Sequence, residues 1–285
     1  MTKHWSPWYT YDDWQPDFIS FKETLDGGQA FCWHAIDEHT FEGVVLKIPI
    51  RLHWNPDNQI QWSAAGGLIT ETSDILSDYL GSNHSYKDYY DTLPWRSDTH
   101  LKRCIEQFRE LRILRQPRGE TLLGFLCSAT KQIVQIKEML TLLRDRFGTP
   151  LPSGHKALPT WEQLYHIGEL ELRDCKLGFR AANIKKTAAC LAERDNYLES
   201  VISSSYTEAK SQLCFLPGVG EKVADCVLLF GYNKLEAFPV DTWVIKVMKR
   251  HYGLDNWHPK QVAQFGRSHF GAYAGLAQQF LFAWE

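Results

Sequence analysis

Two residues in the segment 209–244 have side chains suited to nucleophilic chemistry. The pattern there predicts helix, tight turn, helix, loop and helix, and Lys222 falls in the first turn of the second helix. The helix dipole and partial burial would both disfavour its cation, which leaves an amine able to attack carbon. Asp241 precedes the next helix and fits an N-cap position, although capping alone would explain it. Spacing by itself leaves both catalytic roles open.

The turn before Lys222 has the composition of a phosphate-binding hairpin. Pro217 ends the first helix, and Gly218 and Gly220 permit backbone angles that side chains resist. Backbone N–H groups at a helix start suit phosphate, so Gly218, Val219 and Gly220 are candidate DNA contacts. A Gly-Val-Gly segment alone is more often an ordinary corner between helices. The surrounding motifs are needed to distinguish such a corner from a phosphate-binding turn.

Charge is unevenly distributed along the 285 residues, although the formal net charge is only −3. Bulk charge would not hold this chain on DNA, which requires clustered cations. Solvated helix faces explain each basic stretch as well as phosphate contact does. The two stretches contain Lys102, Arg103, Arg109, Arg112, Arg115 and Arg118, and then Arg173, Lys176, Arg180, Lys185 and Lys186.

The seven cysteines include no close pair of the kind that binds zinc or forms a local disulfide. Reduced thiols inside a cell are the simplest explanation. The first residues offer no apolar export segment, and no stretch is long and apolar enough for a membrane span. We therefore expect a cytoplasmic or nucleoid-associated protein, nuclear in a eukaryote, that is not secreted.

Two regions of different periodicity predict an α+β fold. From Phe18 to Trp62, short apolar runs alternate with turn residues, including a turn at 55–58, which indicates an antiparallel sheet. After about Thr99 the spacing becomes helical and remains so. The predicted parts are an N-terminal antiparallel β domain over 1–98 and a larger all-helical domain over 99–285, with a helix-hairpin-helix motif at about 207–231 and a Pro-Val-Asp loop at 239–241.

Several motifs together resemble the 8-oxoguanine DNA glycosylase/lyase family of the helix-hairpin-helix DNA glycosylases. They are GQAFCW early in the sheet, FLCSATKQI, LGFRAANI, the hairpin LPGVGEKVADC, FPVD, and the closing AYAGLAQQFLF. Their order along the chain is the order found in that family. Several long motifs in register are far more specific than one hairpin.

The resemblance implies a reaction on a nucleotide flipped out of the duplex. It assigns Lys222 as the nucleophile that attacks the sugar C1′, forms a Schiff base and supports strand cleavage. It assigns Asp241 as the carboxylate that stabilises the cationic sugar. The expected function is removal of 8-oxoguanine with AP lyase activity. The alternatives are a monofunctional glycosylase for alkylated bases and a noncatalytic DNA-binding protein.

The resemblance also implies a pocket for the flipped base. Cys226 would pack on one face of the base and Phe282 would stack on the other, with Gln278 reading the Watson–Crick edge. Pro239 lies at the same pocket, and the carbonyl of Gly28 would accept the N7 proton that distinguishes 8-oxoguanine from guanine. Without the resemblance, Asp26-Gly27-Gly28 would be a hairpin turn and Phe282 part of a core stripe.

The opposite base and the DNA backbone involve further residues, and here the chain departs from the family. Phe179 and Arg180 match the residues that fill the void and contact the orphaned base. Thr130 begins a stretch where many members carry asparagines, and Gln135 replaces an arginine, so we predict relaxed opposite-base preference. Trp243 stands where a histidine commonly touches phosphate, which puts that contact in doubt.

The resemblance implies few partners beyond DNA. We expect no cofactor and no iron-sulfur cluster, because no C-terminal cysteine cluster follows the helical domain. Backbone carbonyls at Cys214, Leu216 and Val219 could hold a structural cation. The expected partner is double-stranded DNA containing an oxidised purine, bound by a monomer without a membrane.

Overall fold

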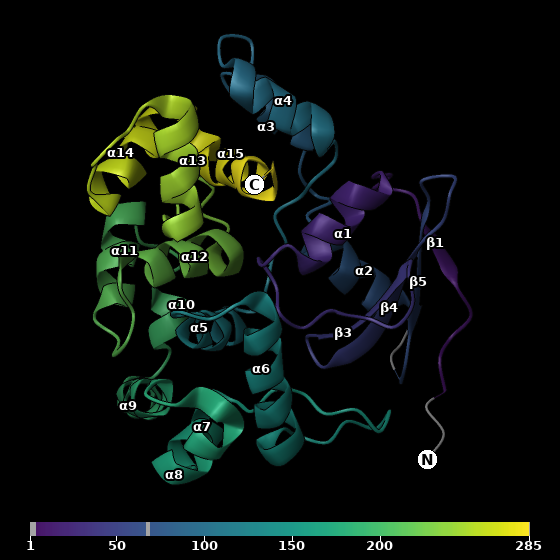
Figure 1. The fold of residues 1–285 in the computed structure, drawn as a ribbon. Helices are drawn as coiled ribbons and strands as arrows, with labels where there is room; N and C mark the ends of the chain where they lie inside the picture. Colours follow the sequence, from purple (N-terminus) through teal and green to yellow (C-terminus); the bar gives the residue numbers. More distant parts are fainter. Residues whose placement is uncertain (1–3, 67–68, 285) are drawn as a thin grey trace.

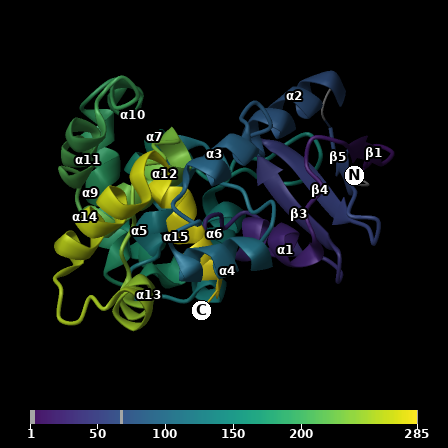
Figure 2. The same ribbon diagram turned by 90° about the horizontal axis from the view of Figure 1, so that it is seen from above.

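An antiparallel sheet and a larger group of helices lie side by side in the computed structural model, which describes residues 4–66 and 69–284 (Figures 1 and 2). The sheet has the strand order β1-β5-β4-β3-β2, and every neighbouring pair is antiparallel. The α+β class predicted from the sequence is confirmed. The strands are β1 (Tyr9–Tyr11), β2 (His34–Ala35), β3 (Thr40–Val45), β4 (Ile48–Trp54) and β5 (Ile60–Ala64).

Short local signals determine the turns of this sheet. Leu46 and Lys47 join β3 to β4 with φ of 47° and 69°, the left-handed angles of a two-residue hairpin. The predicted turn at 55–58 is confirmed, because Asn58 donates to the Asn55 carbonyl at 3.0 Å. Register follows from this geometry and pairs Phe41 with Leu52, both of them buried.

The segment Phe18–Asp26 is a helix, α1, and not part of the sheet as we predicted. Asp17 caps it by accepting a 2.7 Å hydrogen bond from the Ser20 amide. Phe21 and Leu25 are fully buried and four residues apart, which is a helical rather than an alternating pattern. The short apolar runs were therefore misleading at this place, and the corner after α1 is the end of a helix, not a hairpin.

Helices account for most of the remaining chain, as predicted for the part after about Thr99; α2 and α3 lie before it, in the part predicted as a β domain. One large hydrophobic core, which extends from Phe31 to Leu281, joins the helices after α2, whereas α2 packs in the core of the sheet through Leu76 and Tyr79. The helices are α2 (Ile69–Tyr79), α3 (Tyr86–Thr92), α4 (Thr99–Gln107), α5 (Arg118–Cys127), α6 (Ile133–Phe147), α7 (Trp161–His166), α8 (Glu169–Leu172), α9 (Arg180–Ala192), α10 (Tyr197–Ser200), α11 (Tyr206–Cys214), α12 (Glu221–Tyr232), α13 (Thr242–Tyr252), α14 (Pro259–Phe270) and α15 (Ala274–Trp284), with a π turn at Arg173–Leu177 and a 3-10 turn at Gly271–Tyr273.

The segment 110–116 links the sheet to the helices. Trp14 donates its indole N–H to the Glu110 carbonyl at 2.8 Å, and Leu114 belongs to the hydrophobic core of the sheet. The side-chain amide of Gln116 donates to the Gln29 carbonyl at 2.6 Å. Residues after 98 thus form hydrogen bonds and hydrophobic contacts with the sheet part. The domain boundary between residues 98 and 99 stays a prediction.

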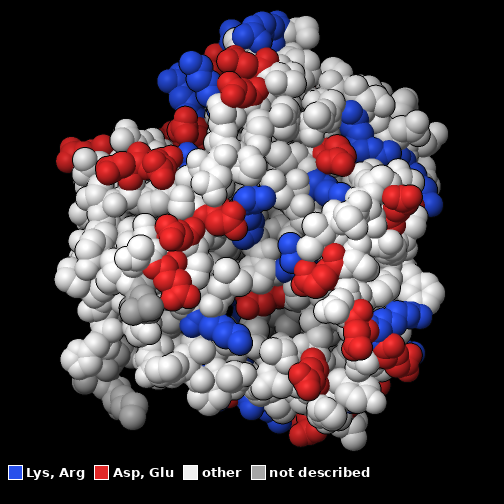
Figure 3. Space-filling model, turned by 180° about the vertical axis from the view of Figure 1, so that it is seen from behind, with Lys and Arg blue, Asp and Glu red and all other residues white. Residues whose placement is uncertain are grey.

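The face shown in Figure 3 carries acidic and basic side chains side by side. Among its described residues, cations do not gather into one broad patch, so this face lacks the concentrated positive charge that a phosphate backbone favours. None of the helices within residues 4–66 and 69–284 has the length and apolar character needed to cross a bilayer.

Candidate active site

One cavity brings together residues from four distant parts of the chain. It lies between the corner after α1, the helix α5, the helix α12 with the loop that follows it, and α15. The separation of these segments in sequence means that only the tertiary fold creates the site. Its lining residues are Gly27, Gly28, Phe125, Lys222, Cys226, Phe230, Pro239, Asp241, Gln278, Gln279 and Phe282.

Lys222 lies in the first turn of α12, as predicted, directly after Glu221. Its Nζ donates a hydrogen bond to the Ser128 hydroxyl at 3.2 Å and lies 5.2 Å from the centre of the Phe125 ring. The ring supplies a cation–π contact, while the hydroxyl fixes one N–H direction. The amine is therefore partly buried and oriented at the wall of the cavity.

Asp241 caps α13, so the predicted capping position is confirmed. Its Oδ1 accepts from the amides of Trp243 and Val244, both at 2.9 Å. Because both bonds use Oδ1, the lone pairs of Oδ2 stay available to a partner in the cavity. The cap thus holds a carboxylate rigidly beside the space that Lys222 also lines.

The thiol of Cys226 supplies an uncharged wall. The residue follows Lys222 by one helical turn and is 3% exposed. Burial raises the pKa of Cys226 to about 12, although the neighbouring Lys222 acts in the opposite direction. The sulfur is thus a neutral thiol at physiological pH, which suits packing against a base and not attack on a sugar.

Two adjacent glutamines provide amide groups in the otherwise apolar part of the cavity. Gln278 is 4% exposed, and its Oε1 accepts a hydrogen bond from Gln279 Nε2 at 2.8 Å. An amide buried this deeply needs partners, so the remaining donor of Gln278 favours a polar ligand. Phe282 lines the same cavity one turn further along α15.

The backbone at Gly28 lies so close to the cavity wall that a side chain at this position would not fit. Its φ is +98°, and an added Cβ would lie 3.0 Å from Ile133 Cδ1 and 3.9 Å from Phe282. Both the backbone angle and the crowding therefore require glycine. This position at the C-terminal corner of α1 replaces the hairpin turn that composition alone suggested.

Buried hydrogen bonds fix the Gly28 corner on both sides. The Gln29 amide is 1% exposed. It donates to the Arg112 carbonyl and accepts from the Leu114 amide, both at 2.8 Å. On the other side, Lys137 of α6 forms an ion pair with Asp26 and donates to the Trp33 carbonyl at 2.5 Å. The sheet part and the helical part thus both hold this corner.

The hairpin before Lys222 has an open tip. Gly218 has φ of +81°, and an added Cβ would lie 2.7 Å from Asn183, so glycine is required there. Gly220 caps α12 without a side-chain hydrogen bond, and nothing lies within 4 Å of where its Cβ would be. The first amides of α12 are accordingly accessible to an anion.

A buried ionic network braces the hairpin from behind. Asp225 is 2% exposed and pairs with Lys210 at 2.8 Å. Tyr206 donates to the same carboxylate at 2.6 Å and accepts from Arg267 at 2.8 Å. The network joins α11, α12 and α14, which fixes the helix that carries Lys222.

The residues predicted to contact the DNA backbone and opposite base lie outside the cavity. Phe179 and Trp243 are 57% and 49% exposed. Gln135 accepts a hydrogen bond from the Gln132 amide at 3.2 Å, which caps α6. Arg180 is only 3% exposed, and its guanidinium bonds to the loop that contains Thr130. Their DNA contacts stay predictions.

The first basic stretch serves the protein's own structure to a large extent. Arg112 is buried and donates to the Asp13 carbonyl at 2.6 Å. Arg115 pairs with Asp78 and Arg118 pairs with Glu199, at 2.7 and 2.8 Å. Sequence spacing did not distinguish such internal bonds from phosphate contacts.

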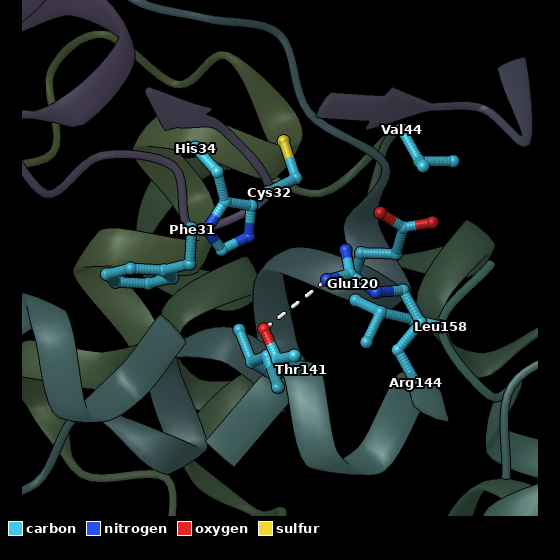
Figure 4. Close-up of a pocket in the computed structure, with 9 residues that line it drawn as sticks. Phe31, Cys32, His34, Val44, Glu120, Thr141, Arg144 and Leu158 are labelled. Atoms are coloured by element: carbon cyan, nitrogen blue, oxygen red, sulfur yellow. Dashed lines mark hydrogen bonds between the residues drawn. The ribbon is translucent and has the colours of Figure 1, made fainter. Parts of the chain in front are cut away.

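A second cavity lies between the sheet and α6, away from Lys222 (Figure 4). Glu120, His34 and Arg144 line it together with apolar groups such as Phe31. Burial raises the pKa of Glu120 to about 7 although Arg144 opposes the shift. Burial also lowers the pKa of His34 to about 4, so the imidazole is neutral at physiological pH.

Sequence reasoning gave no site role to several residues at the cavity, among them Gly27 and Phe230. Ser128 and Phe125 occur in the motif FLCSATKQI but received no role, and Gln279 was passed over beside Gln278. The position of Phe125 three residues before Ser128 places both on one helical face, which is a usable indication. Their contact with Lys222 depends on the tertiary packing of α5 against α12.

Comparison with known families identifies the class of protein. Residues 123–270 match the HhH-GPD superfamily of base excision DNA repair proteins, and these residues include the hairpin, Lys222 and Asp241. Residues 15–122 match the N-terminal domain of 8-oxoguanine DNA glycosylases, which includes Gly28. The chain belongs to the 8-oxoguanine DNA glycosylase family of that superfamily.

Individual relatives agree with this assignment. The chain is 28% identical over 278 residues to N-glycosylase/DNA lyase OGG1 of Arabidopsis thaliana, covering 92% of this chain and 76% of that protein. It is 31% identical to the Clostridium acetobutylicum 8-oxoguanine glycosylase/lyase in its apo-form, with a TM-score of 0.84 over 93% of this chain and 92% of that chain. The complex of that enzyme with double-stranded DNA containing cytosine opposite 8-oxoguanine gives a TM-score of 0.86, at 28% identity over 98% and 97% of the two chains.

Proposed function

We propose that this protein is a bifunctional DNA glycosylase that removes 8-oxoguanine from duplex DNA and then cleaves the strand. The observation that carries the proposal is the cavity in which Lys222 and Asp241 face the base-pocket candidates Gly28, Cys226 and Gln278. A phosphate-binding hairpin alone would not require a nucleophile, a carboxylate and amide groups in one cavity. Family membership supports the same conclusion.

Recognition begins with extrusion of the damaged nucleotide, because its base is inaccessible inside a duplex. The flipped base would lie between Cys226 and Phe282, where a neutral thiol and an aromatic ring favour a flat heterocycle. Gln278 would meet its Watson–Crick edge. The Gly28 carbonyl would accept the N7 proton of 8-oxoguanine and would face a lone pair in guanine, which disfavours the undamaged base.

The reaction then uses the oriented amine. Lys222 Nζ bonds to the sugar C1′ as the glycosidic bond breaks, and the departing base takes the electron pair and a proton. Asp241 stabilises the positive charge that develops on the sugar, because its carboxylate is held in place before the reaction starts. The amine then gives up a proton, the C1′–O4′ bond of the sugar ring breaks, and O4′ becomes a hydroxyl as C1′ and Nζ form a Schiff base. Removal of a C2′ proton then expels the 3′ phosphate by elimination.

Borohydride trapping on duplexes containing 8-oxoguanine tests this function. The wild type should form a covalent complex, Lys222→Gln should form none, and Asp241→Asn should form it far more slowly. Lys87→Gln is the matched control, because it removes an exposed lysine from α3. Trapping that persists in Lys222→Gln would refute the assigned nucleophile.

The same assay separates the two alternative functions. A noncatalytic DNA-binding protein would bind the duplex without any trapped complex. A monofunctional glycosylase for alkylated bases would release a methylated purine in preference to 8-oxoguanine and would leave the strand intact. Lys222 and the amide of Gln278 count against both alternatives, since neither activity requires them.

We also propose that the enzyme acts as a monomer on double-stranded DNA in the compartment that holds the genome, the cytoplasm and nucleoid or the nucleus. All residues of the cavity come from one chain, so a second copy is not needed to complete it. Sedimentation velocity with and without duplex would test this proposal. A dimer at assay concentration would refute it.

A structural cation in the hairpin and the absence of any other cofactor complete the proposal. The Val219 amide donates to the Leu216 carbonyl at 3.1 Å, which makes this turn tight. Backbone carbonyl oxygens at Cys214, Leu216 and Val219 are donors of the kind that hard cations prefer. DNA affinity that is the same in potassium and in tetramethylammonium salts of equal ionic strength would argue against the cation.

A further inference from the structure

Arg180 bonds almost entirely to the backbone of its own chain. It is the first residue of α9 and is 3% exposed. Its Nε donates to the Ala129 carbonyl at 3.1 Å, and its Nη2 donates to the same oxygen. Nη1 donates to the Leu177 carbonyl at 3.2 Å, and Nη2 also reaches the Thr130 hydroxyl at 3.0 Å. The guanidinium group thus fits a structural role, in which its hydrogen bonds hold the loop at Ala129 and Thr130 in place.

The loop that Arg180 holds contains an unfavourable backbone conformation. Thr130 has φ of +56°, in the left-handed region that β-branched residues rarely adopt. The hydrogen bonds of Arg180 bracket this residue, because they engage the carbonyl before it and its own hydroxyl. Such a conformation persists only where surrounding contacts enforce it. Arg180 supplies these contacts.

The same loop carries the hydrogen-bond acceptor of Lys222. Ser128 lies two residues before Thr130, and its hydroxyl donates to the Phe125 carbonyl at 2.7 Å. Its single proton is therefore engaged, so the oxygen can only accept from the Lys222 amine, at 3.2 Å. The direction of one N–H bond of Lys222 is fixed by where this loop places Ser128.

We propose that Arg180 is a positioning residue for Lys222, acting through the loop 128–130. It holds Ala129 and Thr130 in the left-handed corner and so places the Ser128 hydroxyl against the nucleophile. Displacement of this loop would release the amine from its orientation. The inference rests on the proposed function, because it requires that Lys222 be the nucleophile.

This role differs from the opposite-base contact predicted for Arg180 from the sequence. A residue that reads the opposite base affects the reaction differently with each opposite base. A residue that positions Lys222 affects it equally with all four. It also affects an abasic-site substrate, which has no damaged base to bind. The two roles therefore predict different substrate profiles for the same variant.

The test is a double-mutant cycle measured by single-turnover borohydride trapping at saturating enzyme. Arg180→Gln and Ser128→Ala should each slow trapping about tenfold, the effect of losing one hydrogen bond to a charged group. The double variant should also be slowed about tenfold and not about a hundredfold, because both changes remove the same contact. Arg96→Gln removes a surface arginine and is the charge-matched control.

Rescue distinguishes positioning from general damage. Thr130→Asn should restore most of the trapping rate of Arg180→Gln, because asparagine tolerates left-handed angles without help. Ser128→Thr should retain the wild-type rate, since it keeps the hydroxyl. Slowing should be equal opposite cytosine, adenine, guanine and thymine. If Arg180→Gln does not fold, as judged by its thermal midpoint, Arg180→Lys replaces it in the same cycle.

Three outcomes would each overturn the inference. The first is a double variant slowed by the product of the two single effects. The others are slowing confined to one opposite base, and a Thr130→Asn change that does not restore the rate. The outcome is distinguishable from failure of the proposed function. If the wild type forms no trapped complex, the proposed function fails. If the wild type and Arg180→Gln trap at the same rate, only the role of Arg180 fails.

Discussion

The carboxyl group of Glu120 makes the stability of the fold depend on pH. In the second cavity its pKa is raised by burial from 4.5 to about 7. Between these values the folded protein binds a proton that the unfolded chain releases, so the free energy of unfolding falls as pH rises through this window. Each tenfold change in proton affinity corresponds to about 1.4 kcal/mol. The raised pKa of Glu120 therefore lowers the free energy of unfolding by about 3 kcal/mol above pH 7.

Glu120→Gln keeps the shape of the side chain and removes its charge. We expect the variant to be more stable than the wild type by about 3 kcal/mol at pH 8 and by almost nothing at pH 4, where the glutamate is protonated in both states. Urea unfolding followed by tryptophan fluorescence at pH 4, 6 and 8 measures this difference.

Glu162→Gln provides the control, because it removes the same charge from an exposed position on α7. A gain for Glu120→Gln that is equal at pH 4 and pH 8 would mean that packing, and not ionisation, explains the stabilisation. Absence of any gain at pH 8 would mean that the carboxyl is solvated in the folded protein, and the reasoning from burial would be wrong.

Three further predictions concern the active site. Gly28→Ala should slow excision of 8-oxoguanine at least tenfold while leaving cleavage of an abasic site nearly unchanged, because the added Cβ crowds the base pocket at Ile133; equal losses on both substrates would contradict this. Asp225→Asn should lower the free energy of unfolding by about 3 kcal/mol in urea titrations, since it removes the buried carboxylate that Lys210 and Tyr206 bind and leaves Lys210 only Glu221, at 3.4 Å; a change below about 1 kcal/mol would contradict it. Excision should proceed at comparable rates opposite all four bases because Gln135 lacks the rigid donor of an arginine, and strong preference for cytosine in single-turnover assays would refute that.

Local patterns in the sequence were sufficient for the hairpin. Pro217, Gly218 and Gly220 separate two helical stretches, and the helices α11 and α12 begin and end close to the predicted limits. Asp241 was placed correctly as a cap for the same reason. Such features depend on residues within a few positions of one another, so one sequence contains the information.

Long-range contacts could not be predicted in the same way. Ser128 meets Lys222 only because α5 packs on α12, and no spacing along the chain indicates this contact. Arg112 and Arg180 resembled surface cations in the sequence, yet their guanidinium groups are buried against backbone carbonyls. Whether an arginine serves the fold or a ligand is decided by its tertiary surroundings.

The anchoring of the Gly28 corner has a consequence for fidelity. In the proposed function, discrimination against guanine depends on the position of this corner, which Gln29 and Lys137 fix from opposite sides. The proposed nucleophile, Lys222, belongs to α12, and the Asp225 network holds that helix independently of the corner. Heat or denaturant that loosens the corner first should therefore yield an enzyme that still cuts abasic strands but accepts undamaged guanine more readily. Discrimination against guanine should thus be lost before cleavage of abasic strands.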